Sequence, residues 1–229
     1  MSNSNSTGPE VDFETDAENQ NNPYHRTAES YEKKLNMPVV RNFRRAEARK
    51  LHQVFNTVIK PEDTVLEIGC GTGYYTRDIV KRAAKVIALD DSATMLRIVR
   101  DRLPEADRKK VVFVRSEGTQ YEPETPADIV MHIGVLDYVK DWEHFLEHSL
   151  RNARRAVIFT CPTNGPWGQV FHLLARWEGV RIQRYHSRQI EAWLHRHHPD
   201  WHCEMSLVGL NSGWSGAMTW VGVLTRRSG

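Results

Sequence analysis

Short apolar runs rich in β-branched residues alternate with amphipathic stretches along the middle of the chain. The stretches at about 74–84, 92–103 and 141–152 have the period of helices, and the apolar runs are typical of buried strands. Five strands are expected, at Thr64–Ile68, Val86–Asp90, Val111–Arg115, Ala127–Ile133 and Ala156–Cys161. Because strands that alternate with helices form βαβ units, the pattern predicts a mostly parallel sheet.

The C-terminal third departs from this alternation. Residues 167–179 and 187–198 have helical patterns, and two further strand-like runs, 203–209 and 217–225, flank the turn sequence Asn211-Ser212-Gly213. That order predicts an antiparallel hairpin at the end of the sheet. The expected fold class is therefore α/β, a three-layer domain with a seven-stranded sheet that is parallel except for the hairpin.

A helical pattern also precedes the first strand. Pro38 divides it into a short helix near 27–36 and a longer one near 38–59. Because these helices and those of 163–200 lie outside the alternating pattern, we expect residues 24–59 and 163–200 to form a helical cap over one edge of the core. Residues 23–229 would then be a single domain.

The first 22 residues differ from the rest in composition. They hold five acidic residues and no Lys or Arg, with few apolar side chains, so we interpret 1–22 as a disordered acidic tail. The whole chain has a formal net charge of +2, and the body after this tail is more basic. A basic body suits an anionic substrate, a membrane surface or RNA, and it is also what an ordinary solvated surface looks like.

Composition indicates an ordinary globular protein. No run of apolar residues reaches the ~20 that a transmembrane helix needs, and the N-terminus lacks the basic and apolar segments of a secretory signal. Three cysteines, without a CxxC pair, argue against a disulfide framework and a structural zinc site. The expected location is the cytoplasm, and the oligomeric state is left open.

The most informative segment lies where the first strand ends. Glu67 is followed by Gly69, Gly71 and Gly73, and a helix opens at about Tyr74. Such glycines allow a tight turn and close approach of a ligand to the backbone, which indicates a nucleotide-like cofactor. The spacing differs from the dinucleotide fingerprint G-x-G-x-x-G, and the Lys of a P-loop is missing. A carboxylate beside the loop would repel a pyrophosphate but would attract a cationic amine.

These residues resemble motif I of the class I S-adenosylmethionine (SAM)-dependent methyltransferases, and further signals of that family follow in order over residues 60–162. The resemblance implies a Rossmann-like fold with SAM as cofactor and an acid at the end of the second strand that binds the ribose. It also implies a third-strand loop that holds the adenine and a motif IV at Asp128–Leu136. The expected cofactor-binding residues are Glu67, Gly69, Cys70, Gly71, Gly73, Asp90, Asp91, Met95, Ser116, Glu117, His132 and Tyr31.

Two departures limit what the resemblance implies. Glu117 stands where Asp is more common, which preserves the chemistry, and Asp137-Tyr138 stands where many relatives carry a pair of histidines. A catalytic histidine is therefore not implied at that place. The sequences of the expected cap match no subfamily.

Two histidines are candidate catalytic residues. His132 ends the fourth strand, beside the expected sulfonium, and His186 precedes a helix of the expected cap. Each also has a structural interpretation, since buried histidines bonded to the backbone are common. A metal site is not expected, because Pro199 should end the helix that carries most of the other C-terminal histidines.

Four functions remain open from the sequence. The leading hypothesis is transfer of a methyl group from SAM to an oxygen or nitrogen atom of a small-molecule acceptor, a metabolite or natural product. A lipid or membrane-surface methyltransferase is the second, because the helix near 38–59 is basic. RNA methylation is less favoured, since the Asn-Pro-Pro-Tyr-like signature is missing after the fourth strand. A SAM-binding regulator without activity is the fourth.

Overall fold

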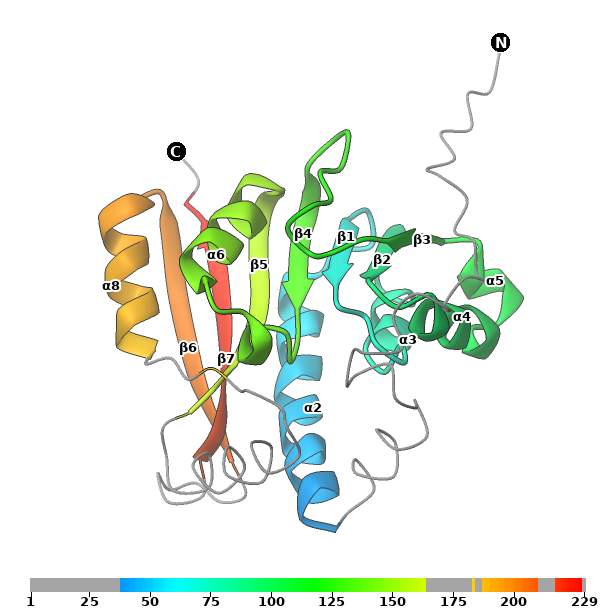
Figure 1. Ribbon diagram of the computed structural model, residues 1–229, viewed down its shortest axis with the longest axis horizontal. Coiled ribbons are helices and arrows are strands. Elements are labelled where there is room, and N and C mark those ends of the chain that lie inside the picture. Colours follow the sequence, from blue (N-terminus) through cyan, green and yellow to red (C-terminus); the bar gives the residue numbers. More distant parts are fainter. Residues whose placement is uncertain (1–37, 164–182, 184–186, 210–216, 228–229) are drawn as a thin grey trace.

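The computed structural model describes residues 38–163, 183, 187–209 and 217–227. These residues form a seven-stranded sheet with helices on both faces (Figure 1). The expected acidic tail, the first helix near 27–36, the helix near 167–179 and the turn at 211–213 lie outside the described residues.

The strands follow the sequence expectation closely. They are β1 (Thr64–Ile68), β2 (Lys85–Asp90), β3 (Val111–Arg115), β4 (Ala127–His132), β5 (Ala153–Pro162), β6 (Trp201–Gly209) and β7 (Ala217–Arg226). Their order in the sheet is β3-β2-β1-β4-β5-β7-β6. β1 to β5 are parallel, whereas β7 is antiparallel to both β5 and β6. The expected mixed sheet with antiparallel C-terminal strands is confirmed.

The strand order places a topological switch point between β1 and β4. The chain runs outward from β1 to β3 on one side, and then crosses to β4 and β5 on the other side. Connections from the two neighbouring strands therefore leave in opposite directions and open a crevice at the carboxyl ends of the strands. This crevice is where a ligand site is expected in such a sheet.

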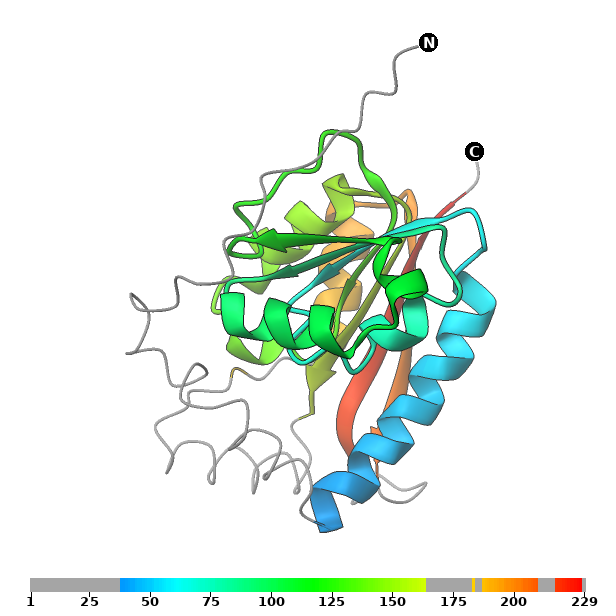
Figure 2. The same cartoon turned by 90° about the vertical axis from the view of Figure 1, so that its right-hand side faces the viewer.

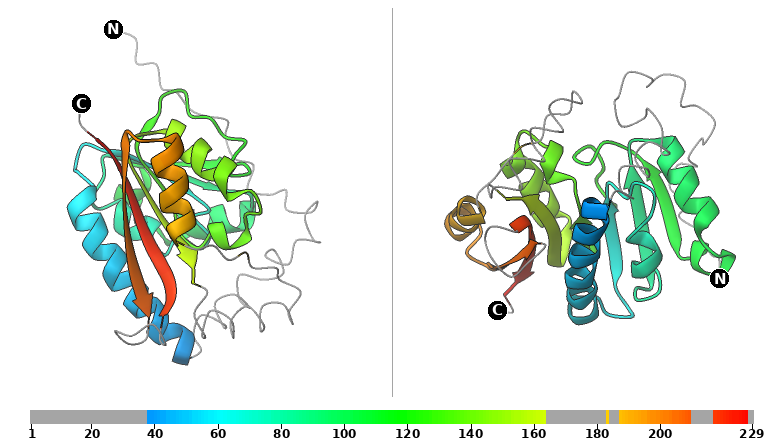
Figure 3. Two further views of the ribbon diagram at one scale, coloured as in Figure 1. Left: turned by 90° about the vertical axis from the view of Figure 1, so that its left-hand side faces the viewer. Right: turned by 90° about the horizontal axis from the view of Figure 1, so that it is seen from below.

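The helices form a layer on each face. One face carries α2 (Pro38–Val58), α3 (Thr76–Ile79) and α4 (Ala93–Arg102), and the other carries α6 (Trp142–Arg151) and α8 (Ser187–His197). β6 and β7 lie between α2 and α8 in the left view of Figure 3. Figure 2 shows α2 running obliquely along the sheet. A short α5 (Glu105–Arg108) and the 3₁₀ turn η2 (Leu136–Tyr138) complete the described elements.

The structure places α2 and α8 differently from the sequence expectation of a cap. Leu51 and Phe55 of α2 are fully buried in the same core cluster as β1, β4 and β5 residues. Ile190 and Leu194 of α8 are buried in the cluster on the opposite face. Because these apolar faces are buried, α2 and α8 both contribute to the core. They belong to the helical layers that cover the two faces of the sheet. The remaining parts of the expected cap are mostly outside the described residues.

Replacing Leu51 with alanine tests whether α2 is part of the core. We expect Leu51→Ala to lower the free energy of unfolding by about 2–5 kcal/mol, because a fully buried leucine leaves a cavity. Arg49→Ala, an exposed change two residues away, should alter it by at most about 0.5 kcal/mol. Urea unfolding followed by circular dichroism measures both, and equal effects would show that α2 is only loosely attached.

Candidate active site

A glycine loop connects β1 to α3 and forms the floor of the site. Gly69, Gly71 and Gly73 have φ values of 72°, 52° and 76°, in the left-handed region that favours glycine. A Cβ at Gly69 would lie 2.6 Å from Cγ2 of Val135, so the loop packs directly against the segment after β4. At Gly71 a Cβ would meet nothing within 4 Å, so the backbone there is open to a ligand.

Asp90, the last residue of β2, holds the loop in place. Its Oδ2 accepts a hydrogen bond from the Gly71 N–H at 2.8 Å, and its Oδ1 accepts one from the Ser92 N–H at 3.0 Å. Burial raises the pKa of Asp90 to about 7, although both N–H bonds favour the charged form. Each carboxylate oxygen can accept a second hydrogen bond, so the side chain can also bind a hydroxyl pair of a ligand.

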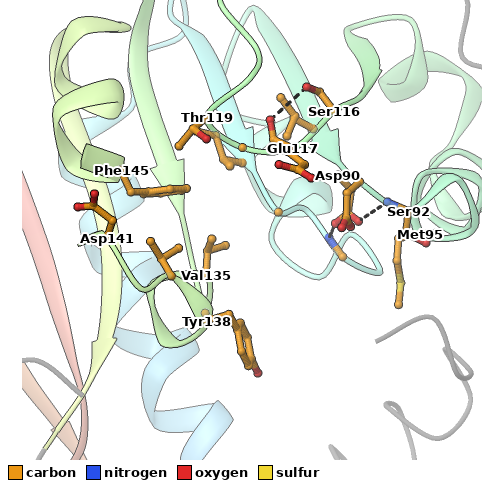
Figure 4. Close-up of a pocket in the computed structure, with 18 of the residues that line it drawn as sticks. Asp90, Ser92, Met95, Ser116, Glu117, Thr119, Val135, Tyr138, Asp141 and Phe145 are labelled. Carbon is orange, nitrogen blue, oxygen red and sulfur yellow. Dashed lines mark hydrogen bonds between the residues drawn. The ribbon is translucent and has the colours of Figure 1, made fainter. Parts of the chain in front are cut away.

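Ser92 continues this local order into α4. Its backbone is extended, and its Oγ accepts a hydrogen bond from the Met95 N–H at 3.3 Å, as an N-cap residue does. The cap turns the chain so that the Met95 side chain lies on the wall of the site, as labelled in Figure 4.

A cavity of about 580 Å³ lies between the ends of β1, β2 and β4. Its volume is in the range of small-molecule and cofactor sites. Figure 4 shows its walls, which come from the two glycine-bearing loops, the 116–119 segment and the start of α6. Ile68, Leu89, Val135 and Phe145 supply apolar surface. Gly118 allows close packing there, since a Cβ on it would lie 3.0 Å from the Phe145 ring.

The charge of the cavity wall is negative. Four carboxylates line it (Asp90, Asp91, Glu117 and Asp141), and its described lining contains no Lys or Arg. Such a wall favours a cationic ligand. Glu117 accepts a hydrogen bond from Gln120 Nε2 at 2.9 Å, and Asp141 caps α6 by accepting one from the His144 N–H at 3.1 Å.

Several residues expected from the sequence line this cavity. They are Gly69, Gly71, Asp90, Asp91, Met95, Ser116 and Glu117. Others from the same expectation lie behind the loop. The Cys70 side chain is buried in the core cluster of α2 and α3, and a Cβ on Gly73 would meet Val99 of α4 at 2.9 Å.

Glu67 lies under the glycine loop, outside the cavity lining. Its Oε2 accepts a hydrogen bond of 2.6 Å from Thr76 Oγ1, and burial raises its pKa to about 8. Side chains alternate along a strand, so Glu67 points to the same face as Val65, toward α3, whereas Ile68 points into the cavity. The geometry makes Glu67 a brace between β1 and α3.

His132 is enclosed in the core beside the cavity. Its side chain is fully buried, stacked on Phe159 at 5.6 Å and edge-on to Phe145 at 5.0 Å between ring centroids. Neither ring nitrogen has a hydrogen-bond partner among the described residues, and burial lowers the pKa of His132 to about 3. His132 is therefore neutral and separated from the cavity by Phe145. The other candidates, Tyr31 and His186, lie outside the described residues.

The described residues contain no group of three or more His, Cys, Asp or Glu side chains that could hold a metal ion. His197 Nδ1 lies 3.0 Å from the Trp193 carbonyl oxygen, and His198 Nε2 lies 2.7 Å from Glu147 Oε2.

Among all the residues that the structure describes, no helix has the length and apolar character needed to cross a bilayer.

Sequence reasoning missed several residues of the cavity wall, among them Thr119, Val135, Tyr138, Asp141 and Phe145. The signal for Asp141 was present, because an Asp immediately before a helical stretch is a typical N-cap. Phe145 has no local signal, because only the packing of α6 against the sheet brings it to the cavity.

Comparison with known proteins bears on this site. Residues 66–156, which include the end of β1, the glycine loop, Asp90 and β4, match a family model described as a methyltransferase domain. Over these residues the chain carries a methyltransferase domain, and the comparisons support a class I SAM-dependent methyltransferase. Its subfamily is not resolved by the comparisons.

Curated relatives of this methyltransferase domain differ in what they methylate. The chain is 26% identical over 160 residues to trans-aconitate 2-methyltransferase of Azoarcus sp. (57% of this chain, 59% of that protein). It is 45% identical over 99 residues to magnesium-protoporphyrin O-methyltransferase of Rhodobacter capsulatus (42% of this chain, 43% of that protein). Other matches are named as protein and ribosomal RNA methyltransferases. The chain thus spans little more than half, or less, of these relatives.

A solved structure shares the fold of the methyltransferase domain over most of its length. Magnesium protoporphyrin IX methyltransferase from Synechocystis PCC 6803, solved with bound S-adenosylhomocysteine (SAH), superimposes with a TM-score of 0.69. The match covers 86% of this chain and 93% of that chain at 15% identity. At this identity the match establishes the fold.

The cavity fits the donor that this family uses. SAM joins an adenosine to a positively charged sulfonium and an ammonium group, and the wall offers four carboxylates for the charge and apolar side chains for the flat base. Asp90 has carboxylate oxygens at the end of β2, and the open backbone at Gly71 leaves room beside it. The size, charge and shape of the described wall agree with this ligand.

Removing the Asp90 carboxylate tests the site directly. We expect Asp90→Ala to weaken binding of SAH at least about 100-fold, because the anchor of the Gly71 loop is lost together with the oxygens that we expect to accept the ligand's hydroxyls. His132→Ala should leave SAH affinity unchanged because Phe145 separates the ring from the cavity. Isothermal titration calorimetry measures both, and an equal loss in the two variants would contradict this geometry.

The pH dependence of binding gives a second test. The pKa of Asp90 in the free protein is about 7, and the ionised form is the one that accepts hydroxyl hydrogen bonds. The affinity for SAH should therefore fall by up to about tenfold per pH unit below pH 7, and binding near pH 7 should release protons. Calorimetry in buffers of different ionisation enthalpy detects this release. Constant affinity between pH 5.5 and 7 would contradict the role of Asp90.

Proposed function

We propose that this chain transfers the methyl group of SAM to an oxygen or nitrogen atom of a small-molecule acceptor. The observation that carries the proposal is the acidic cavity between the Gly69–Gly73 loop and Asp90, at the switch point of a methyltransferase fold. The printed names of two relatives, which specify trans-aconitate and magnesium-protoporphyrin, support a small acceptor. The second of these names gives oxygen as the methylated atom.

Each part of the site has a proposed role. Asp90 would accept hydrogen bonds from the ribose hydroxyls, and Glu117 with its neighbours Ser116 and Thr119 would meet the adenine. Phe145 and Val135 would pack against the flat base. Glu67 would act indirectly, by holding Thr76 and so the shape of the glycine loop. Met95, from the first turn of α4, would close the wall beside the ribose.

The chemistry is an in-line displacement. SAM supplies an electrophilic methyl group on a positively charged sulfur, which leaves as a neutral thioether. The chain's own contribution is alignment of the acceptor with the methyl group and exclusion of water. The glycines of the loop adopt left-handed φ values, and the hydrogen bond from the Gly71 N–H to Asp90 holds the loop against the end of β2. The site is therefore organised before any ligand arrives, which lowers the entropy lost on alignment.

A second candidate is a methyltransferase that works at a membrane surface. Arg41, Arg45 and Arg49 are exposed and spaced by four residues, so they form a basic stripe along the outer face of α2. Such a stripe can attract anionic lipid headgroups. Among the α2 side chains whose exposure the structure describes, the exposed ones are all polar or charged, unlike those of a helix that buries an apolar face in a membrane interface, and the small-molecule proposal is therefore preferred. The free cysteines Cys70, Cys161 and Cys203 agree with a reducing compartment such as the cytoplasm, which we also propose.

Transfer of a labelled methyl group tests the proposed function. The chain is incubated with SAM tritiated in the methyl group and with a cell extract, which is then separated into polar metabolites, lipids, RNA and protein. We expect the label to enter the small-molecule fraction, and Asp90→Ala to abolish this transfer. Label in lipid would favour the second candidate, and label confined to RNA or protein would contradict both. SAH binding without any transfer would indicate a binding protein instead of an enzyme.

A further inference from the structure

Part of the cavity wall belongs to the long connection between β3 and β4. Residues 116–126 run from one strand to the other without a helix or strand, and the first four of them line the cavity. The connection starts beside Asp90, whose carbonyl oxygen accepts a hydrogen bond of 3.2 Å from the Ser116 N–H. It then reaches α6, where Gly118 packs against the Phe145 ring, and Figure 4 shows Ser116 and Phe145 on different sides of the cavity. Because connections are more mobile than the elements they join, an ordered wall needs further contacts.

A turn within this connection holds the Glu117 carboxylate. The Gln120 N–H donates a hydrogen bond of 3.1 Å to the Glu117 carbonyl oxygen, and Gln120 Nε2 donates one of 2.9 Å to Glu117 Oε2. One carboxylate oxygen is thus turned toward Gln120, which fixes the direction of the other. Both side chains are exposed, and hydrogen bonds that compete with water stabilise a conformation only modestly. The turn therefore orients Glu117 but does not by itself hold the connection against the protein.

A buried histidine of α6 contacts the connection just after this turn. His148 is 1% exposed, and its Nε2 lies 3.0 Å from the carbonyl oxygen of Tyr121. Because a carbonyl oxygen can only accept a hydrogen bond, this geometry assigns the ring proton to Nε2. The end of the connection is held as well, since the Ala127 N–H donates to the carbonyl oxygen of Asn152, the C-cap residue of α6, at 2.9 Å. Of these two anchors on α6, the one at Tyr121 depends on a side chain.

The His148 contact has a cost that an apolar side chain would avoid. Burial lowers the pKa of His148, against the charge of Glu122, which raises it, so the ring is neutral at pH 7. Its Nδ1 is buried and has no hydrogen-bond partner among the described residues. An unpaired buried nitrogen destabilises a fold, and such a group calls for an explanation. A leucine would remove this cost, but it would leave the Tyr121 carbonyl oxygen without its donor.

We propose that His148 and Gln120 are positioning residues that set the specificity of this site for the base of the methyl donor. His148 holds the connection at Tyr121, and Gln120 orients Glu117, so that the carboxylate accepts a hydrogen bond from the 6-amino group of adenine. The inference rests on the proposed function, in which Glu117 meets the adenine, and adds the residues that hold it there. Neither side chain belongs to the described cavity wall. A base with an oxo group at the same position would place an oxygen against the carboxylate, with no hydrogen between them.

The analogue S-inosylhomocysteine, which carries hypoxanthine in place of adenine, measures this specificity. It differs from SAH only in the base, and both ligands bind without an acceptor, so the acceptor need not be known. We expect the wild-type chain to bind the analogue at least about 30-fold more weakly than SAH, because Glu117 meets an oxygen instead of an amino group. The readout is the ratio of the two dissociation constants, measured by isothermal titration calorimetry.

Variants of His148 separate a positioning role from a merely structural one. His148→Leu removes the donor to the Tyr121 carbonyl oxygen and should lower the wild-type ratio at least about fivefold. His148→Gln carries an amide N–H near the position of Nε2 and should keep the ratio within about twofold of wild type. Ser149→Ala is the matched control, because this buried hydroxyl donates to the Phe145 carbonyl oxygen of the same helix at 3.0 Å. It should leave the ratio unchanged even if the melting temperature falls.

Gln120→Ala tests the second positioning residue. The side chain is exposed, so we expect this variant to fold with an unchanged melting temperature. Loss of the hydrogen bond to Glu117 Oε2 should lower the ratio about threefold, because the carboxylate is no longer held in one direction. An unchanged ratio in this variant would overturn the role of Gln120.

The outcomes separate the inference from the function on which it rests. A wild-type chain that binds both ligands equally would remove the adenine contact of Glu117 and the inference with it, whereas methyl transfer is decided by the labelling experiment. A preference that Glu117→Ala abolishes and His148→Leu retains would overturn the role of His148 alone. An equal loss of affinity for both ligands in His148→Leu would show that His148 is structural, and would also overturn its role. If the leucine variant does not fold, His148→Asn, whose amide is too short to reach Tyr121, replaces it with the same expected fall.

Discussion

The site depends on one buried carboxylate that is shared between two backbone segments. Asp90 ends β2, and its two oxygens hold the Gly71 N–H of the glycine loop and the Ser92 N–H at the start of α4. The loop belongs to the β1 connection and α4 to the β2 connection, so one side chain sets the relative position of both. Burial makes this carboxylate costly to ionise, and a cationic ligand offsets part of that cost. The Asp90 side chain therefore both positions the two backbone segments and favours a positively charged ligand.

α2 links the core to the turn that follows the glycine loop. Its C-terminal half packs Leu51, Val54 and Phe55 against the sheet, and Glu47, one turn earlier, reaches Tyr75 beside the glycine loop. This hydrogen bond joins the turn before α3 to a helix that is itself part of the core. Side chains beside the glycine loop can be positioned in this way without a separate domain, because rigid elements hold side chains more closely than loops do.

The sequence predicts those parts of the site whose residues lie close together along the chain. The glycine loop and Asp90 could be recognised because strand, turn and helix signals follow one another within about thirty residues, as in other βαβ units. Glu67 and His132 were expected at the ligand, but strand alternation turns Glu67 toward α3 and His132 under Phe145. Glu47 and Tyr75 are 28 residues apart, and only the packing of α2 on the sheet brings them together. The placement of α2 and α8 against the sheet could not be predicted for the same reason. An amphipathic pattern shows that one face of a helix is buried, but it does not show which element buries that face.

The acidic wall of the cavity has a consequence for the turnover cycle. Methyl transfer converts a sulfonium into a neutral thioether, so the ligand loses one positive charge while Asp90, Asp91, Glu117 and Asp141 stay in place. The attraction between wall and ligand is then weaker after the reaction than before it. In the proposed reaction, the chemical step itself therefore lowers the electrostatic contribution to ligand binding, and this change favours exchange of the product for a new donor.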